Sequence, residues 1–103
     1  MEFKQCKFRP GQIVHHKRYQ YRGVVLDVDV SCQATDDWYN GNHTQPKRNQ
    51  PWYQILVDDD NKATYVAEEN LEEDETCLPV NHPLIDQVFL RYKNGGYERV
   101  FDA

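Results

Sequence analysis

The chain has 103 residues, the length of one compact domain, and we expect residues 1–103 to form a single domain with a modest hydrophobic core. Hydrophobic residues make up 39% and charged residues 28%, which excludes an intrinsically disordered chain. The net charge of −5 disfavours a general nucleic-acid binder. The charge is uneven, however, because residues 1–22 hold six cations and one acid, whereas residues 58–75 hold nine acids and one cation.

The sequence contains no membrane or export signal. Its longest aliphatic run, Val24-Val25-Leu26, is far shorter than a membrane span, and no apolar stretch follows the first residues. Three widely spaced cysteines, Cys6, Cys32 and Cys77, fit neither a disulfide framework nor a zinc site. We therefore expect reduced thiols, a cytoplasmic location and no membrane contact.

The first two strands are expected early in the chain. Pro10-Gly11 precedes a strand over residues 12–16, and a second strand follows over residues 23–30. In the second strand the apolar side chains alternate with polar ones, which is typical of a half-buried strand. The side chains that this alternation places on one face are Val24, Leu26, Val28 and Val30.

Residues 31–51 interrupt the strand pattern with Ser, Thr, Asn, Gly, Gln and Pro. A loop of that length in a small domain is uncommon and is often functional or mobile. We expect residues 33–49 to be the most mobile internal segment, to contain no regular helix or strand, and to be anchored by Trp38. Trp38 and Tyr39 are the candidate partner-binding residues of this loop.

Further strands are expected over residues 52–57 and 63–67, joined by an acidic turn, and then over residues 88–92 and 97–101 around Asn94-Gly95-Gly96. An alternative for the segment 83–90 is a short helix. Short strands separated by turns predict an all-β fold, a small antiparallel barrel of about five strands with one long loop. The residues expected to be buried are Ile13, Val24, Leu26, Val28, Ile55, Val57, Tyr65 and Leu71.

The sequence carries no recognisable catalytic motif. It lacks the G-x-S-x-G, H-E-x-x-H and phosphate-loop patterns. The four histidines lack the spacing of metal ligands, and the adjacent His15 and His16 would point to opposite faces of a strand. We therefore expect a protein without enzyme activity, metal or cofactor.

The segment 15–22 interleaves cations with aromatic residues, an arrangement that suits phosphate contact combined with stacking. The alternative is a β-turn whose tyrosines pack on the end of the barrel and whose cations are merely solvated. On the first interpretation, cations of the long loop join those of the segment. The candidate DNA-binding residues are then Lys17, Arg18, Tyr19, Tyr21, Arg22, Lys47 and Arg48.

Several blocks of the sequence resemble a known family. They are His16–Val25, Gln50–Asp59 and Tyr65–Leu71, followed by a tail that begins at His82-Pro83-Leu84-Ile85. In this order, over about residues 8–101, they resemble the hemimethylated-DNA-binding domains of the YccV/HspQ family. The tail is similar to that of the longer variants, which include a domain appended to an F-box protein of the ubiquitin system.

The resemblance implies an SH3-like barrel without catalysis and a preference for hemimethylated DNA. It also implies a second role, because members of this family are linked to ATP-dependent proteolysis as adaptors and some are heat-shock proteins. Two kinds of partner therefore stay open. One is a hemimethylated duplex, read by an apolar pocket near cations. The other is a protease or client protein, gripped by an open barrel edge and the aromatic loop. Self-association stays open as well.

Overall fold

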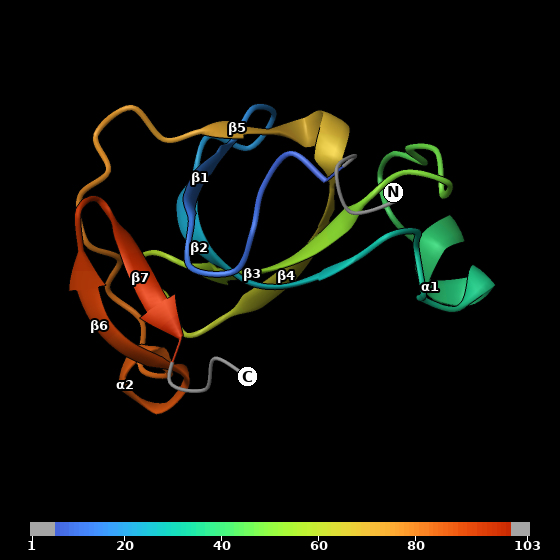
Figure 1. Cartoon of the computed structure of the whole chain (residues 1–103). Helices are drawn as coiled ribbons and strands as arrows, with labels where there is room; N and C mark the ends of the chain where they lie inside the picture. Colours follow the sequence, from blue (N-terminus) through green and yellow to red (C-terminus); the bar gives the residue numbers. More distant parts are fainter. Residues whose placement is uncertain (1–5, 100–103) are drawn as a thin grey trace.

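The computed structural model describes residues 6–99, which form mainly two antiparallel β-sheets (Figure 1). Five strands make the first sheet in the order β4-β3-β2-β1-β5, and β6 and β7 make the second. The strands are β1 (Ile13–His16), β2 (Arg22–Asp29), β3 (Trp52–Val57), β4 (Ala63–Ala67), β5 (Leu71–Glu73), β6 (Phe89–Lys93) and β7 (Gly96–Arg99). The helices are α1 (Asp36–Asn40), the 3-10 turn η2 (Glu68–Asn70) and α2 (Ile85–Val88).

The predicted antiparallel, mostly β architecture is confirmed, but the sheet is not closed by hydrogen bonds. Within residues 6–99, the edge strands β4 and β5 do not pair with each other. The fifth strand of the large sheet, β5, was not predicted, because a three-residue segment with two glutamates lacks an alternating pattern. The predicted C-terminal strands instead form their own sheet, and part of the second one, residues 100–101, lies outside the described residues.

A β-bulge in β2 overturns the prediction that its alternating residues share one face. Val25 pairs with Ile55, and the next paired residue, Asp27, faces Gln54, so that Leu26 is the extra residue. The bulge reverses the orientation of the residues that follow it. Val24 and Leu26 consequently belong to one apolar cluster and Val28 to another, and Val30 is exposed.

The large sheet buries apolar side chains on both of its faces. One face carries a cluster of Phe8, Val14, Val25, Tyr53, Ile55, Val66 and Leu71. The other face, with Ile13, Val24 and Leu56, is covered by Val80 and Phe89 of the C-terminal segment. Figure 1 shows α2, β6 and β7 packed together at one end of the molecule. The C-terminal segment therefore completes the core on the face that a five-stranded sheet alone would expose.

The predicted core is largely confirmed. Five of its members are buried: Ile13, Val24, Ile55, Val57 and Leu71. The other three, Leu26, Val28 and Tyr65, are only partly buried, although each packs against one of the clusters. Leu26 is the extra residue of the bulge, which leaves its side chain partly exposed. Tyr65 lies on an edge strand.

The prediction that the segment 33–49 contains no helix was wrong, because α1 lies within it. Thr35 caps the helix, with its Oγ1 accepting a hydrogen bond of 3.2 Å from the backbone N–H of Trp38. The ring of Trp38 meets Trp52 and Tyr65 edge-on, at centroid distances of 6.1 and 5.6 Å. These contacts fasten the segment to the sheet through Trp38.

The cysteines Cys6, Cys32 and Cys77 are free, as expected. No helix within residues 6–99 has the length and apolar character needed to cross a lipid bilayer.

Candidate functional site

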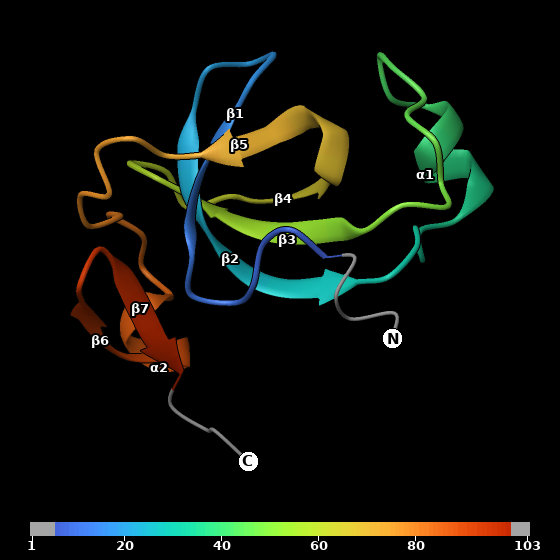
Figure 2. The same ribbon diagram turned by 45° about the horizontal axis from the view of Figure 1, so that its top comes forward.

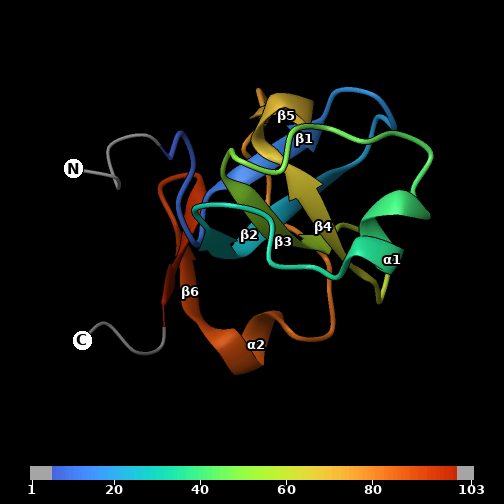
Figure 3. The same cartoon turned by 90° about the vertical axis from the view of Figure 1, so that its right-hand side faces the viewer.

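A groove of about 650 Å³ lies between the β1–β2 turn, the edge strand β4 and α1. Its walls include four aromatic side chains, and we call it the aromatic groove after Tyr19, Tyr21, Trp38 and Tyr65. A smaller hollow of about 260 Å³ shares Tyr19 and Tyr65 with it and extends along the segment after α1. Figure 2 shows the β1–β2 turn and the segment after α1 rising from the same side of the large sheet, and Figure 3 shows α1 beside β4.

His16, the last residue of β1, shapes the turn that forms one wall. Its Nδ1 accepts hydrogen bonds of 3.1 Å from the backbone N–H groups of both Arg18 and Tyr19. The turn closes with Gln20 at a φ of 59°, in the left-handed region. Lys17, Arg18 and Tyr19 are thereby held at the exposed tip.

The His16 imidazole is neutral at physiological pH. Burial lowers its pKa, and the charges of His15 and Arg18 lower it further. Because Nδ1 is an acceptor, the proton resides on Nε2, which makes no hydrogen bond within residues 6–99. Every fully buried side-chain nitrogen and oxygen in that part of the chain has a partner. Nε2 is therefore not completely buried, although His16 as a whole is only 4% exposed, and His16 lines the groove.

The two aromatic walls are fixed by hydrogen bonds. The hydroxyl of Tyr21 lies 2.7 Å from Thr64 Oγ1, which joins the β1–β2 side to β4, and burial raises the pKa of Tyr21. Across the groove, Tyr65 donates to Asp29 Oδ2 at 2.6 Å. Burial and this bond to Asp29 raise the pKa of Tyr65 well above its ordinary value. Both phenols therefore stay protonated, and the groove presents neutral aromatic surfaces.

Five of the predicted site residues gather here. Tyr19, Tyr21 and Trp38 line the groove, and Lys17 and Arg18 are exposed on the turn beside Tyr19. The Arg18 guanidinium lies 5.7 Å from the ring centre of Tyr19. Among residues 6–99, neither Lys17 nor Arg18 forms an ion pair.

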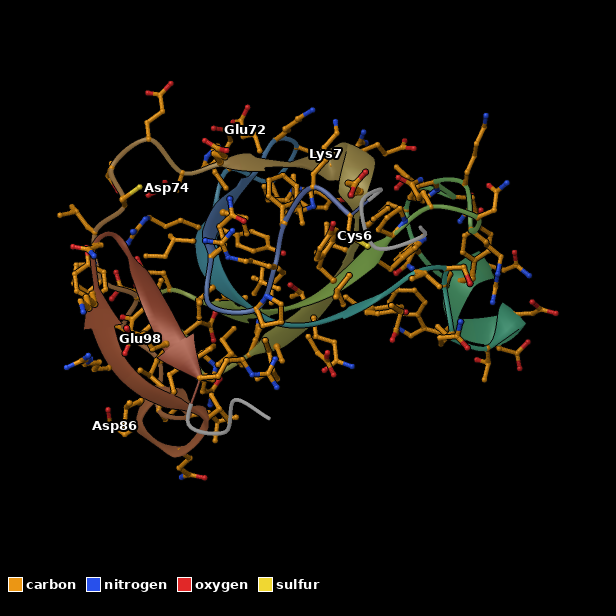
Figure 4. All side chains as sticks on the ribbon, viewed as in Figure 1. Cys6, Lys7, Glu72, Asp74, Asp86 and Glu98 are labelled. Atoms are coloured by element: carbon orange, nitrogen blue, oxygen red, sulfur yellow. The ribbon has the colours of Figure 1, made fainter. Side chains whose placement is uncertain are left out.

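Arg22 lies elsewhere. Its Nη1 donates to Asp58 at 3.0 Å and its Nε donates to Asp74 at 3.2 Å, while the carbonyls of Leu78 and Pro79 accept bonds from Nη2 and Nη1. Figure 4 shows Asp74 near the end of β5, beside the β6–β7 hairpin. Arg22 thus ties the large sheet to the C-terminal segment, and its donors are already engaged.

The remaining candidates belong to the long segment after β2. Arg48 pairs with Asp36 at 3.2 Å and lies 4.8 Å above the ring of Tyr39. Tyr39 packs against the Trp52 cluster and donates to the Pro46 carbonyl at 2.7 Å. Lys47 is exposed, and its carbonyl accepts a bond of 3.2 Å from the Trp52 indole. Arg48 and Tyr39 therefore stabilise the segment internally, and neither lines the groove.

Sequence reasoning missed the part that His16 and Tyr65 take in the groove. His16 was considered as a metal ligand and as part of the segment 15–22, but it was not named among the candidate residues, and Tyr65 was expected in the core. No signal in the sequence marked Tyr65, because β4 has the composition of an ordinary strand and its place at the sheet edge is known only from the pairing. In the described residues, no group of three or more His, Cys, Asp or Glu side chains is placed to hold a metal ion.

Comparison with known proteins gives the family. The model described as "Hemimethylated DNA-binding protein YccV like" matches residues 6–96. The chain belongs to the YccV-like family. Curated relatives include F-box only protein 21 of Pongo abelii and of Homo sapiens, each 34% identical over 90 residues, and that of Mus musculus, 33% identical over 90 residues. Each alignment covers 84% of this chain and 14% of the relative, so this YccV-like chain corresponds to a small part of those proteins.

Proposed function

We propose that this YccV-like chain is a non-catalytic binding module for hemimethylated duplex DNA, with Lys17 and Arg18 on the phosphates and the aromatic groove beside them. The observation that carries the proposal is the β1–β2 turn, which holds two exposed cations, without ion pairs to any described residue, at the edge of an aromatic surface. The printed description of the family supports the choice of ligand. We also propose that the large sheet is an SH3-like barrel left open along β4, which its strand order supports.

The proposed contact face is small. Lys17 and Arg18, joined by the exposed Lys47, neutralise about two or three phosphates, so the logarithm of affinity falls with that of salt with a slope of roughly −2 to −3. Arg22 and Arg48 are left out because carboxylates already hold them. With so few phosphate contacts, the distinction between methylation states must come from apolar contact with a methyl group in the major groove. Tyr19, exposed next to Arg18, is the side chain placed for it.

The test is a salt series of binding measurements with one duplex sequence in hemimethylated, fully methylated and unmethylated form. We expect the hemimethylated duplex to bind most tightly, and the double variant Lys17→Gln/Arg18→Gln to flatten the salt slope by about two. The control, Lys93→Gln/Arg99→Gln, removes a lysine and an arginine from the exposed C-terminal hairpin. Equal loss in both variants, or no duplex binding at low salt, would overturn the proposal.

A second candidate function is that of a protein adaptor, a role in which members of the family are linked to ATP-dependent proteolysis. Two observations favour it. Arg22 and Arg48, which would enlarge a DNA-binding face, are used inside the fold, and the curated relatives are F-box proteins. An adaptor would show no duplex binding at moderate salt, and it would lose its protein partner in the variant Trp38→Ala.

A further inference from the structure

The free edge of β4 opens onto the aromatic groove. β4 is the last strand of the large sheet, and among residues 6–99 it pairs only with β3. At its two ends, Lys62 O accepts from Val57 N at 3.1 Å, and Glu68 N donates to Pro51 O at 2.9 Å. Hydrogen-bonded pairs recur at every second residue of an antiparallel ladder. Thr64 and Val66 therefore bond to β3.

The same alternation turns the backbone N–H and C=O groups of Ala63 and Tyr65 away from β3. No hydrogen bond within residues 6–99 satisfies these outward groups. An exposed strand edge of this kind is a template for another strand.

The groove contains side chains from both faces of β4. Thr64 and Val66 border it with the tyrosines of the β1–β2 side, and Tyr65 borders it with Trp38 of α1. A chain lying along this edge would point its successive side chains alternately to the two sides. One set would meet Tyr19 and Tyr21, and the other would meet Trp38.

We propose that the aromatic groove binds an extended segment of a partner protein as an additional strand on β4. The segment forms backbone hydrogen bonds with Ala63 and Tyr65 and inserts apolar side chains at alternate positions, as in other cases of strand addition. Five residues of β4 span about 17 Å, which sets the length of the bound segment at five to seven residues. Strand addition depends on the backbone of β4, whereas the DNA contact proposed above depends on the charges of Lys17 and Arg18, which lie beside both surfaces.

The charge around the groove indicates the ends of the segment. Lys17 and Arg18 are exposed at the β1–β2 turn, next to Tyr19 in the groove wall, and neither pairs with a carboxylate in the described part of the chain. The segment therefore carries acidic residues at the end that passes the turn, because opposite charges on the two partners favour one orientation.

The experiment begins with a displayed library of random heptapeptides selected on the whole chain. We expect the selected peptides to alternate apolar and polar residues and to carry Asp or Glu at one end. A synthetic peptide from this selection is then measured against Ala63→Pro, which removes one outward N–H without removing a bond to β3. We expect about tenfold weaker binding. The matched control Ala63→Val keeps that N–H and should bind as the unchanged chain does.

Amide hydrogen exchange provides the second readout. The added strand should slow exchange of the Tyr65 N–H, which is otherwise free, while the Val66 N–H is already bonded to β3. A duplex bound through Lys17 and Arg18 leaves the exchange rate of the Tyr65 N–H unchanged. The exchange measurement therefore distinguishes failure of the strand-addition proposal from failure of the DNA-binding proposal. Selection of no peptide, peptides without alternation, or a bound peptide that leaves Tyr65 exchange unchanged would overturn the proposal. So would concentration-dependent dimerisation that slows the same amide, because the occupant would then be a second copy of this chain.

Discussion

The two ends of the segment 16–22 place like charges in opposite environments. At one end Arg22 is surrounded by the carboxylates of Asp58 and Asp74 and by two carbonyls. At the other end Lys17 and Arg18 are exposed and pair with no carboxylate of the described residues. Cations in one short stretch of sequence therefore serve two purposes, and only the free ones are available to a partner.

Two regions beside the large sheet, its junction with the C-terminal segment and its β4 edge, differ in the same way. On the face covered by the C-terminal segment, packing is so close that a Cβ on Gly11 would lie 2.1 Å from the carbonyl oxygen of Tyr97. On the side of β4, a groove stays open between aromatic residues. Close packing with satisfied polar groups is typical of a structural junction, whereas an open groove lined by aromatic residues is typical of a surface that binds a ligand.

The substitution Arg22→Met is the strongest test of whether Arg22 stabilises the fold. The change keeps an unbranched apolar side chain but leaves Asp58 and the buried Asp74 without their cation. We expect a loss of about 3–5 kcal/mol in the free energy of unfolding, measured by urea denaturation. Arg18→Met, on the exposed turn, is the matched control and should change it by less than about 0.5 kcal/mol. Equal losses in the two variants would mean that the ion cluster is not structural.

The dependence of stability on acidic pH gives a second test of the ion pair between Arg22 and Asp74. Burial acts to raise the pKa of Asp74, but hydrogen bonds from Thr76 and the charge of Arg22 outweigh it and hold the pKa below the ordinary value of 3.8. A carboxyl whose pKa is lower in the folded state stabilises the fold above its unfolded value, and this contribution is lost as the pH falls toward the folded value. In Arg22→Met the folded pKa of Asp74 rises toward or above its unfolded value, so we expect a smaller loss of stability on acidification than in the unchanged chain. Urea midpoints measured from neutral pH downward would show it, and parallel acid profiles would contradict it.

A smaller effect is expected at α1. Thr35→Ala removes the acceptor for the Trp38 N–H and should cost about 1 kcal/mol of local stability, whereas Thr35→Ser keeps the cap. The measurement is amide exchange at Trp38, together with its fluorescence, because the helix holds the ring against Trp52 and Tyr65. Unchanged exchange in Thr35→Ala would show that ring packing alone holds the segment.

The sequence predicted those parts of the fold that depend on local patterns. Alternation located β2, β3 and β4, and Asn94-Gly95 located the last hairpin, where both residues have positive φ. The bulge at Leu26 could not be foreseen, because the alternation continues through it and only pairing with β3 reveals the extra residue. β5 was missed since its pairing with β1 depends on tertiary contacts.

The candidate site was predicted in part for a similar reason. Aromatic and basic residue types indicated Tyr19, Trp38, Lys17 and Arg18, which the fold does bring to one side. The sequence could not separate Arg22 from them, because Asp58 and Asp74 are 36 and 52 residues away along the chain. Partners of that kind are visible only in the folded molecule.

The smallest effect on stability is expected for the exposed cations of the β1–β2 turn. Lys17→Gln/Arg18→Gln removes two exposed charges that have no ion pair among the described residues, so the free energy of unfolding should change by less than about 0.5 kcal/mol. The turn itself should persist, because His16 Nδ1 bonds to the backbone N–H groups of residues 18 and 19, which the substitutions keep. Urea denaturation gives the stability, and the chemical shifts of those two amides give the turn. A loss of more than about 1 kcal/mol would show that these cations, like Arg22, serve the fold. If stability is kept while binding of either DNA or an acidic peptide weakens, their role lies in recognition.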